Sequence, residues 1–339
     1  MDHRRLSTSL PIGQFYAVSY DFAVPYNVCA GAQDNGSWCG PSRRRSGTVG
    51  VANWFGYSGG DGFWTAQDPT DPKIIYGESQ GGAMTRWNLA TGQTSFLFPD
   101  GSSFRRYRQY EDSIILTRGD TTQPETRDMR NRITDLRARQ RQDSLASIMR
   151  FNWETPFFLS PHNKDVLYAG GNHVLKSTQR GDNFYSISPD LSKQDAKKID
   201  ISMKTTGGIT VDATGAETYG TVVALAESPV KPGFLYAGTD DGNVWQSPND
   251  GATWTQIDWR RFPGLPNNEV YVSRIEPSHF DTLTWYIAFD NHRNNDFTPY
   301  LYATADGGKT FTSIAATLPA GGPDHVHVVR EDPYNRDLL

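Results

Sequence analysis

The chain has 339 residues, of which 38 are acidic and 33 basic, so its net charge is −5. This charge argues against a nucleic-acid-binding protein, whose surface carries a basic excess. No apolar run approaches the roughly 18 residues of a membrane-spanning helix. The first residues include two arginines but neither the apolar core nor the cleavage site of a signal peptide. The 32 glycines, 20 prolines and 12% aromatic residues are typical of many short strands joined by turns.

The first pattern along the chain is a cysteine pair. Cys29 and Cys39 flank the turn sequence "QDNG", so a hairpin would bring the two thiols close together. A disulfide would form in an oxidising compartment, and two free thiols would remain in a reducing one. The sequence leaves both alternatives open.

A spacing between proline and tyrosine repeats along the chain. In each copy a proline begins a turn, and a tyrosine follows seven positions later after two apolar residues. Because proline fixes φ and the following residues favour β-structure, each copy predicts a buried inner strand. The copies run from Pro69 to Tyr76, from Pro161 to Tyr168 and from Pro229 to Tyr236, with a looser copy from Pro277 to Tyr286 and an early one from Phe22 to Cys29.

The length of the repeat predicts the fold. Pro229 and Pro277 lie 48 residues apart, a spacing that fits the four-stranded blade of a β-propeller. We therefore predict an all-β fold in which residues 1–339 form one partial propeller domain of about five blades. A last copy begins at Pro333, and its aromatic residue would fall at position 340. We accordingly expect the chain to be a fragment of a larger propeller.

A second motif, Ser/Thr-x-Asp-x-Gly-x-Thr-Trp/Phe, occurs later in three of the repeat units. The aspartate oxygen can accept turn amides, the glycine can take positive φ, and the last aromatic residue can pack back on the blade. The motif resembles the Asp-box, or BNR repeat, of sialidases, sortilin-type receptors and xyloglucanases, which implies a structural turn. The residues are Ser177, Gly181 and Phe184; Ser247, Asn249, Gly251 and Trp254; and Thr304, Asp306, Gly308 and Phe311, with Gln179 and Asn249 in place of the aspartate.

Two repeat units carry insertions. Residues 117–150 form a charged insertion, in which an apolar stripe among many arginines predicts a helix or helical hairpin over 126–149. Its arginines would form either a basic patch that binds an acidic partner or an ordinary solvated helix face. The second insertion, residues 190–220, is predicted as a long loop with a short hairpin.

Two acidic loops are the first candidates for chemistry. Asp34 and Asp61 lie in the glycine-flanked sequences "DNG" and "GDG", and three tryptophans lie nearby. Paired carboxylates beside exposed indoles suit a carbohydrate site, where the acids transfer protons and the rings stack on sugars. The same sequences are also ordinary hairpin turns. The tryptophans considered as ligand-binding residues are Trp38, Trp54 and Trp64.

The stretch "IIYGESQGGAMTRW" is similar to a catalytic element of family 74 xyloglucanases. Gly81, Gly82, Arg86 and Trp87 match that element, while Ser79 stands where the family has a catalytic aspartate. Glu78 lies beside this position and is a candidate catalytic carboxylate, although adjacent residues of a strand face opposite sides of the sheet. Arg86 is counted among the ligand-binding residues.

The chain as a whole resembles bacterial BNR-repeat proteins of the sortilin N-terminal (VPS10)-like group. The segments "GAQDNGSWCGPS", "GGDGFW", "YAGGNHVLKST" and "DNHRNNDFTPYLYATADGGKTF" carry the resemblance. It implies an extracellular or periplasmic location, with a signal peptide upstream of this piece.

Two stretches could offer metal ligands. "DHVHVV" places His325 and His327 on one face of a predicted strand, but no third ligand is evident in the sequence. "DNHRNND", from Asp290 to Asp296, offers oxygen atoms but lacks EF-hand spacing. We therefore expect a structural histidine pair, an insertion loop and no metal. With no phosphate loop or nucleophile elbow in the chain, we also expect no cofactor.

These observations lead to three functional hypotheses. The first is an exported propeller that acts as a binding module for a polysaccharide or an exported protein. The second is a glycoside hydrolase related to xyloglucanases, acting on a β-glucan-type polysaccharide through Asp34, Asp61 or Glu78. The third is an interaction scaffold that recruits a partner through the arginine-rich insertion.

Overall fold

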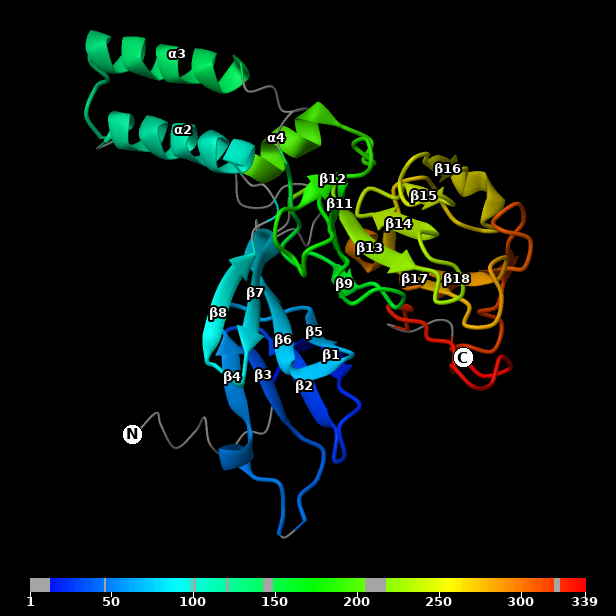
Figure 1. Cartoon of the computed structure of the whole chain (residues 1–339). Coiled ribbons are helices and arrows are strands. Elements are labelled where there is room, and N and C mark those ends of the chain that lie inside the picture. Colours follow the sequence, from blue (N-terminus) through cyan, green and yellow to red (C-terminus); the bar gives the residue numbers. More distant parts are fainter. Residues whose placement is uncertain are drawn as a thin grey trace, which may run out of the picture. The chain divides into compact units, whose positions relative to one another are not determined.

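A computed structural model describes residues 13–45, 47–97, 99, 102–119, 122–142, 149–204, 218–319 and 324–339. In these residues the chain is mostly β, with five four-stranded antiparallel sheets and three α-helices (Figure 1). The prediction of a β fold built from four-stranded sheets is therefore confirmed. The chain divides into two compact units, Met1–Leu97 and Phe98–Leu339, and each is described by itself.

The first unit contains two sheets whose strands follow sequence order. In the second sheet, β5 contacts β1 and β2 of the first, and β6 contacts β3 and β4. The strands of the first sheet are β1 (Phe15–Tyr20), β2 (Asn27–Ala32), β3 (Gly36–Pro41) and β4 (Phe55–Ser58). Those of the second sheet are β5 (Thr65–Asp68), β6 (Asp71–Ser79), β7 (Ala83–Asn88) and β8 (Gln93–Leu97).

The second unit contains three sheets with the same sequential order. The third sheet is β9 (Phe157–Leu159), β10 (Leu167–Gly170), β11 (Val174–Ser177) and β12 (Tyr185–Ser186). The fourth is β13 (Val222–Glu227), β14 (Leu235–Thr239), β15 (Val244–Ser247) and β16 (Thr255–Ile257). The fifth is β17 (Tyr271–Pro277), β18 (Trp285–Asp290), β19 (Tyr300–Thr304) and β20 (Thr312–Ser313).

Each repeated tyrosine lies on the second strand of its sheet, flanked by a strand on either side. Within the second unit, the rings of Tyr168 and Tyr236 face the following sheet. Tyr168 of β10 donates a hydrogen bond to Asp250 Oδ1 of the fourth sheet (2.9 Å), and Tyr236 of β14 packs on Trp285 of the fifth, with 5.2 Å between ring centroids. The sequence repeat therefore marks the contact between consecutive sheets.

Small residues allow consecutive sheets of the second unit to approach closely. A Cβ at Gly238 of β14 would lie 2.2 Å from a methyl carbon of Val272 on β17. A Cβ at Gly170 of β10 would lie 3.0 Å from Val222 on β13. The first strand of each of these later sheets therefore occupies space that only glycine leaves open on the preceding one.

The three turns with the second motif share one hydrogen-bond arrangement. In each, a serine or threonine hydroxyl accepts the N–H of the motif glycine. The bonds are Gly181 N to Ser177 Oγ (3.1 Å), Gly251 N to Ser247 Oγ (2.9 Å) and Gly308 N to Thr304 Oγ1 (3.1 Å). All three glycines have positive φ, between 84° and 96°.

The residue at the aspartate position holds the far side of the turn. Asp306 Oδ1 accepts the amides of Lys309 (2.9 Å) and Thr310 (3.0 Å), and Asn249 Oδ1 accepts the amide of Thr253 (2.9 Å). Phe311, at the end of its motif, packs against Trp285 with 5.0 Å between ring centroids. The final aromatic residue therefore returns to the sheet, as the sequence predicts.

The α-helices lie in or directly before the two insertions. Helix α3 (Arg127–Gln142) falls within the predicted stretch 126–149, while α2 (Ser102–Arg118) precedes it and was not predicted. The two helices contact each other, and Ile114 and Ile133 are buried. The second insertion contains α4 (Ala196–Lys204), and the remainder of its expected hairpin region, 205–217, lies outside the described residues. Among the residues described, no helix is both long and apolar enough to cross a bilayer.

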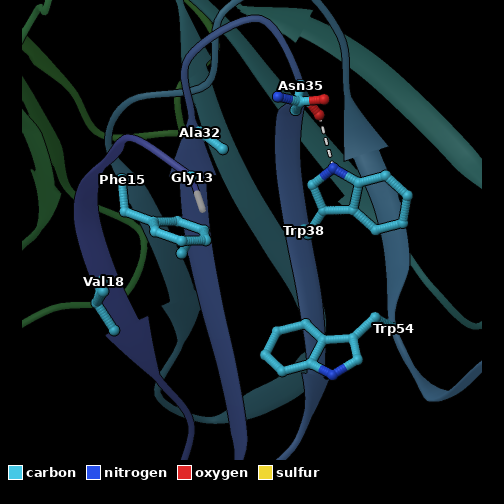
Figure 2. Close-up of a pocket in the computed structure, with 8 residues that line it drawn as sticks. Gly13, Phe15, Val18, Ala32, Asn35, Trp38 and Trp54 are labelled. Carbon is cyan, nitrogen blue, oxygen red and sulfur yellow. Dashed lines mark hydrogen bonds between the residues drawn. The ribbon is translucent and has the colours of Figure 1, made fainter. Parts of the chain in front are cut away.

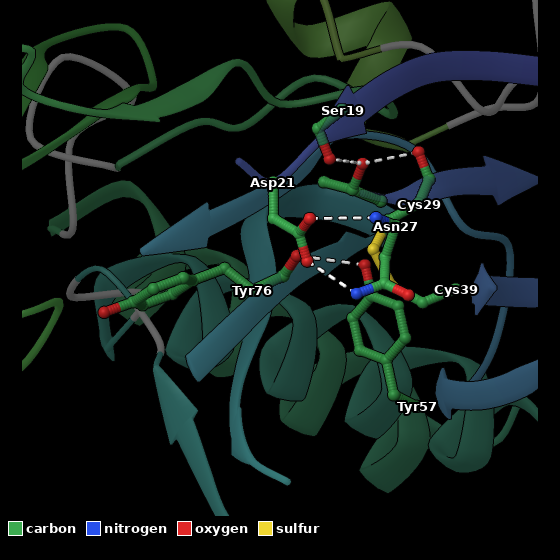
Figure 3. The surroundings of a disulfide bond; sticks show 8 residues. Ser19, Asp21, Asn27, Cys29, Cys39, Tyr57 and Tyr76 are labelled. Carbon is green, nitrogen blue, oxygen red and sulfur yellow. Dashed lines mark hydrogen bonds between the residues drawn. A yellow bond between two sulfur atoms is a disulfide. The ribbon is translucent and has the colours of Figure 1, made fainter. Parts of the chain in front are cut away.

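The cysteine pair lies in the core of the first unit (Figure 3). Cys29 and Cys39 face each other across β2 and β3, with 4.1 Å between their Cα atoms, and form a disulfide. They pack with Tyr57 and Ile75 between the two sheets. The hairpin over "QDNG" therefore brings the thiols together, and of the two alternatives left open by the sequence the structure has the disulfide.

We predict that reducing this disulfide destabilises the first unit. The bond closes a short loop, with a sequence separation of 10, and loop-closure entropy then corresponds to about 2–3 kcal/mol of unfolding free energy. Urea unfolding of the wild type with and without reductant measures this difference. The Cys29→Ala/Cys39→Ala variant is the control, because reductant should leave its unfolding curve unchanged. An unchanged wild-type curve would contradict the prediction.

We also predict an acid-sensitive contribution from Asp306. Hydrogen bonds from the backbone and side chain of Thr310 and from Thr304 hold the pKa of Asp306 well below its usual 3.8. Its contribution to stability is therefore full above about pH 4 and is lost as the pH falls further. Asp306→Asn should keep the turn, as Asn249 does in the fourth sheet, while Asp306→Ala should lower Tm. The Tm difference between the wild type and Asp306→Asn should shrink below pH 4, and a constant difference would contradict this.

Candidate functional site

The two predicted acidic loops lie against each other at one end of the first unit. The Asp34 backbone N–H donates to Asp61 Oδ1 (2.6 Å), and Gln80 Nε2 donates to Asp61 Oδ2 (3.0 Å). The loops pack so closely that a Cβ at Gly62 would lie 2.2 Å from the carbonyl oxygen of Gly36. Asp61 is 7% exposed, and its buried carboxylate connects its own loop to the loops that contain Asp34 and Gln80.

The other two predicted carboxylates differ in exposure. Asp34 is exposed and takes a left-handed backbone conformation, with φ of 61°, in the turn between β2 and β3. Glu78, on β6, has no exposed surface. A general acid or base must reach the substrate directly or through one water molecule. Asp34 meets that condition, whereas Glu78 lies within the packed interior.

Two of the predicted tryptophans line a common pocket of about 520 Å³ on the first sheet (Figure 2). Trp38 and Trp54 are 40% and 36% exposed. Each covers a glycine, since a Cβ at Gly40 would lie 2.4 Å from the Trp54 ring and one at Gly56 would lie 3.5 Å from the Trp38 ring. The Trp38 indole N–H donates to the Asn35 carbonyl oxygen (2.6 Å). The pocket is lined by Gly13, Phe15, Val18, Ala30, Ala32, Asn35, Trp38 and Trp54.

The remaining predicted ligand-binding residues do not line this pocket. Trp64 lies in the loop before β5, where its carbonyl oxygen accepts the Glu78 amide (2.8 Å). Arg86 lies on β7 and donates to Ser95 Oγ (3.3 Å). The structure therefore brings Trp38 and Trp54 together but places Trp64 and Arg86 elsewhere in the unit.

The exposed apolar surface of the first sheet extends beyond the pocket. Tyr20, Phe22 and Tyr26 are 59%, 76% and 49% exposed, and the Tyr20 ring contacts both of the others. Together with Phe15, Val18, Trp38 and Trp54 they form what we call the aromatic face. Contiguous apolar surface of this kind marks interaction sites on proteins.

A second cluster lies in the second unit, where β18 ends. Asp290, the last residue of β18, is buried, and three imidazoles approach its carboxylate. His292 Nδ1 lies 2.6 Å from Asp290 Oδ1, while His325 Nε2 and His327 Nδ1 lie 3.4 and 3.3 Å from Oδ2. We call these four residues the Asp–His cluster.

Hydrogen bonding controls the charge of this cluster. Burial alone would raise the pKa of Asp290, but hydrogen bonds from His327 and from the backbone and ring of His292 lower it to about 2. The bond to Asp290 in turn raises the pKa of His327 above its usual value. The carboxylate is therefore ionised at neutral pH.

A different acid in the second unit behaves in the opposite way. Burial and the neighbouring carboxylate of Asp241 raise the pKa of Asp240 to about 8. Hydrogen bonds from the backbone amides of Thr221 and Gly220 oppose this rise but do not cancel it. These amides donate to Asp240 Oδ1 and Oδ2 at 2.7 and 3.1 Å. Asp240 therefore ties the loop before β13 to the loop after β14.

The sequence revealed only half of the Asp–His cluster. It paired His325 with His327 on a predicted strand, but residues 324–339 contain no strand. The other half of the cluster, Asp290 and His292, comes from the "DNHRNND" stretch, whose sequence predicts only an insertion loop. No spacing signal connects the two segments, because they meet only when Val326 and Val329 pack on the residues of β18 and β19.

The described side chains of helix α3 in the charged insertion are mostly exposed charges. The arginines of α3 from Arg127 to Arg139 are exposed, and Arg139 pairs with Asp135 one turn earlier (3.0 Å). Exposed pairs at this spacing contribute only a few tenths of a kcal/mol. The geometry of α3 therefore fits a solvated helix face.

Comparison with known proteins gives only remote similarities. No family model and no curated protein matches the chain. Among solved structures, the GH74 enzyme of Niastella koreensis is 18% identical over 74% of this chain, with a TM-score of 0.40. The GH74 xyloglucanase of Xanthomonas campestris is 12% identical over 87% (TM-score 0.35), and Sqt1 of Saccharomyces cerevisiae is 12% identical over 84% (TM-score 0.46).

These matches cover only part of each known structure. The chain spans 29%, 42% and 57% of the Niastella, Xanthomonas and Saccharomyces chains, respectively. With TM-scores below 0.5 they add no argument, so the description of the fold rests on the five sheets themselves.

We predict that Asp61 contributes to stability. Asp61→Asn keeps the shape but can no longer accept hydrogen bonds at both oxygens, so unfolding should become easier by about 1–3 kcal/mol. The exposed Asp34→Asn variant is the matched control and should change stability little. Urea unfolding of both variants, beside a reducing-sugar assay on xyloglucan, makes the measurement. Sugar release that disappears in Asp61→Asn at unchanged stability would instead support a catalytic role.

Proposed function

We propose that the chain is an exported, non-catalytic binding module that takes a protein ligand on the aromatic face of its first sheet. The observation that carries the proposal is the open pocket beneath Phe15, Trp38 and Trp54, surrounded by further exposed aromatic rings. Tryptophan and tyrosine are enriched at protein interfaces because they supply large apolar area at low entropic cost. Export is supported by the buried Cys29–Cys39 disulfide, since such bonds persist in oxidising compartments.

The chemistry of the lining favours a protein ligand over a polysaccharide. Apart from the indole N–H groups of its two tryptophans, Asn35 provides the one polar side chain among the eight lining residues of this pocket. A sugar carries hydroxyl groups on every edge, and burying them without partners is unfavourable. An aromatic or aliphatic side chain from a protein has no such requirement, and it would fill the pocket by apolar contact alone.

The hydrolase alternative has weaker geometric support. Both oxygens of Asp61 accept hydrogen bonds from the protein, and Glu78 is enclosed. A glycosidase needs two carboxyl groups that flank the scissile bond. The scaffold alternative, through the arginine-rich helix α3, has only exposed, partly paired charges to support it.

A dye and a polysaccharide distinguish the ligand classes. We expect the apolar fluorescent dye anilinonaphthalene sulfonate to bind the wild type saturably, with affinity reduced about tenfold or more in Trp38→Ala/Trp54→Ala, because two apolar walls are lost. In affinity electrophoresis, xyloglucan in the gel should not slow the migration of the wild type, because the proposed pocket does not bind a glycan. Peptides selected from a displayed library should be rich in aromatic and aliphatic residues and should displace the dye.

Two further variants control this experiment. Val18→Ser changes the pocket without uncovering a glycine, so it keeps the test valid if the double variant unfolds. Leu283→Ser changes an exposed apolar residue of the second unit and should bind the dye as the wild type does. Retardation by xyloglucan that depends on Trp38 would replace the protein ligand with a glycan. Dye binding that is equal in all variants would overturn the proposal.

A further inference from the structure

The Asp–His cluster has the composition and spacing of a metal centre. We propose that Asp290, His292 and His325 bind a divalent transition metal ion of the zinc type, with one coordination position left for water or an exogenous ligand. This inference concerns the second unit and does not depend on the binding function proposed for the first.

The distances between candidate ligand atoms fit one small ion. One ligand atom from each of the three residues lies within 4.8 Å of the other two. Ligands at 2.0–2.1 Å around a tetrahedral zinc ion are separated by roughly 3.3–3.4 Å. Asp290 Oδ2 and His325 Nε2 already lie 3.4 Å apart. This pair already has the separation of two zinc ligands, whereas the His292 ring, whose Nδ1 lies 2.6 Å from Asp290 Oδ1, would have to rotate away from that oxygen to bind the ion.

The charge balance of the cluster points the same way. Asp290 is 3% exposed, and in the described part of the chain its ion-pair contacts are with imidazoles alone. The described structure pairs this buried carboxylate with no lysine or arginine side chain, and a buried charge is costly unless it is compensated. A divalent cation among the rings would compensate that charge directly.

The ligand types select the class of metal. Imidazole and carboxylate together suit zinc and its neighbours in the first transition row, whereas calcium and magnesium require oxygen ligands. Three protein ligands are also the usual number at zinc sites that keep an open position. The sequence "DNHRNND" therefore contributes a carboxylate and an imidazole to a mixed site, in place of an oxygen-only calcium loop.

His327 has a supporting position. Its Nδ1 lies 3.3 Å from Asp290 Oδ2, so it can donate a hydrogen bond to the carboxylate that binds the ion. Groups that orient metal ligands in this way typically change metal affinity 10–100-fold when removed. His327 is therefore assigned as a positioning residue, while the other three residues are the ligands.

The test is metal binding by the full chain without a histidine tag. After chelator treatment and dialysis, calorimetric titration with zinc chloride should give one bound ion per chain. Asp290→Asn and His325→Ala should each weaken binding by at least about tenfold, as should His327→Ala through loss of the orienting bond. Cobalt(II), titrated separately, should show the intense visible absorption of a four- or five-coordinate ion in the wild type only.

The control is His279→Ala, an exposed histidine outside the cluster, which should bind zinc as the wild type does. If one variant fails to fold by circular dichroism, His292→Ala, on the exposed side of the cluster, gives the same comparison. The absence of a stoichiometric site in the wild type would overturn the proposal. So would zinc affinity that is unchanged in folded Asp290→Asn and His325→Ala, because binding would then involve other residues.

Discussion

Close packing between the second strand of one sheet and the first strand of the next is the constraint on which the second unit depends. Val272 of β17 occupies the space above Gly238 of β14, and Val222 of β13 lies above Gly170 of β10. The tyrosine two residues before each glycine then extends to the next sheet, as Tyr168 does to Asp250. A larger residue at either glycine would separate the sheets and the loops that they carry.

Antiparallel pairing within a sheet also brings loops together, since Val222 at the start of β13 pairs with Thr239 at the end of β14. The loop that enters each sheet lies beside the loop that leaves the second strand, so their polar groups can pair. Asp240 holds the amides of Gly220 and Thr221 in this way. The buried guanidinium of Arg150 donates to Asp190 (2.9 Å) and to the Gly220 carbonyl oxygen (3.0 Å). The Asp–His cluster arises differently, because the C-terminal segment around Val326 and Val329 packs on β18 and β19.

In the described residues, one face of the first sheet carries exposed apolar side chains. Side chains alternate between the two faces of a strand. Cys29 and Cys39 therefore face the second sheet, while Ala30 and Trp38 face the other way and line the pocket. The aromatic face has the composition of a surface that another sheet or protein would cover, which is why its chemistry suits an apolar ligand better than a sugar.

The sequence by itself determined the elements that depend on local physics. The spacing of proline and tyrosine, the Ser/Thr-x-Asp-x-Gly-x-Thr-Trp/Phe motif and the turn sequence "QDNG" predicted the four-stranded repeat, the three hairpin turns and the proximity of Cys29 to Cys39. Helix α2 was not predicted from the sequence, and neither was the full burial of Glu78. The sequence also suggested Asp34 and Asp61 as a pair, but the structure has Asp61 accepting the backbone N–H of Asp34 within the packed loops.

Only the tertiary structure decided which distant residues share a site. Trp38 and Trp54 lie in one pocket, while Trp64 lies in the loop before β5 and Arg86 on β7 of the second sheet. Asp290 and His325 are separated by 35 positions and meet through the packing of Val326 and Val329. Local propensities extend over a few residues, whereas such contacts depend on the order and register of whole strands.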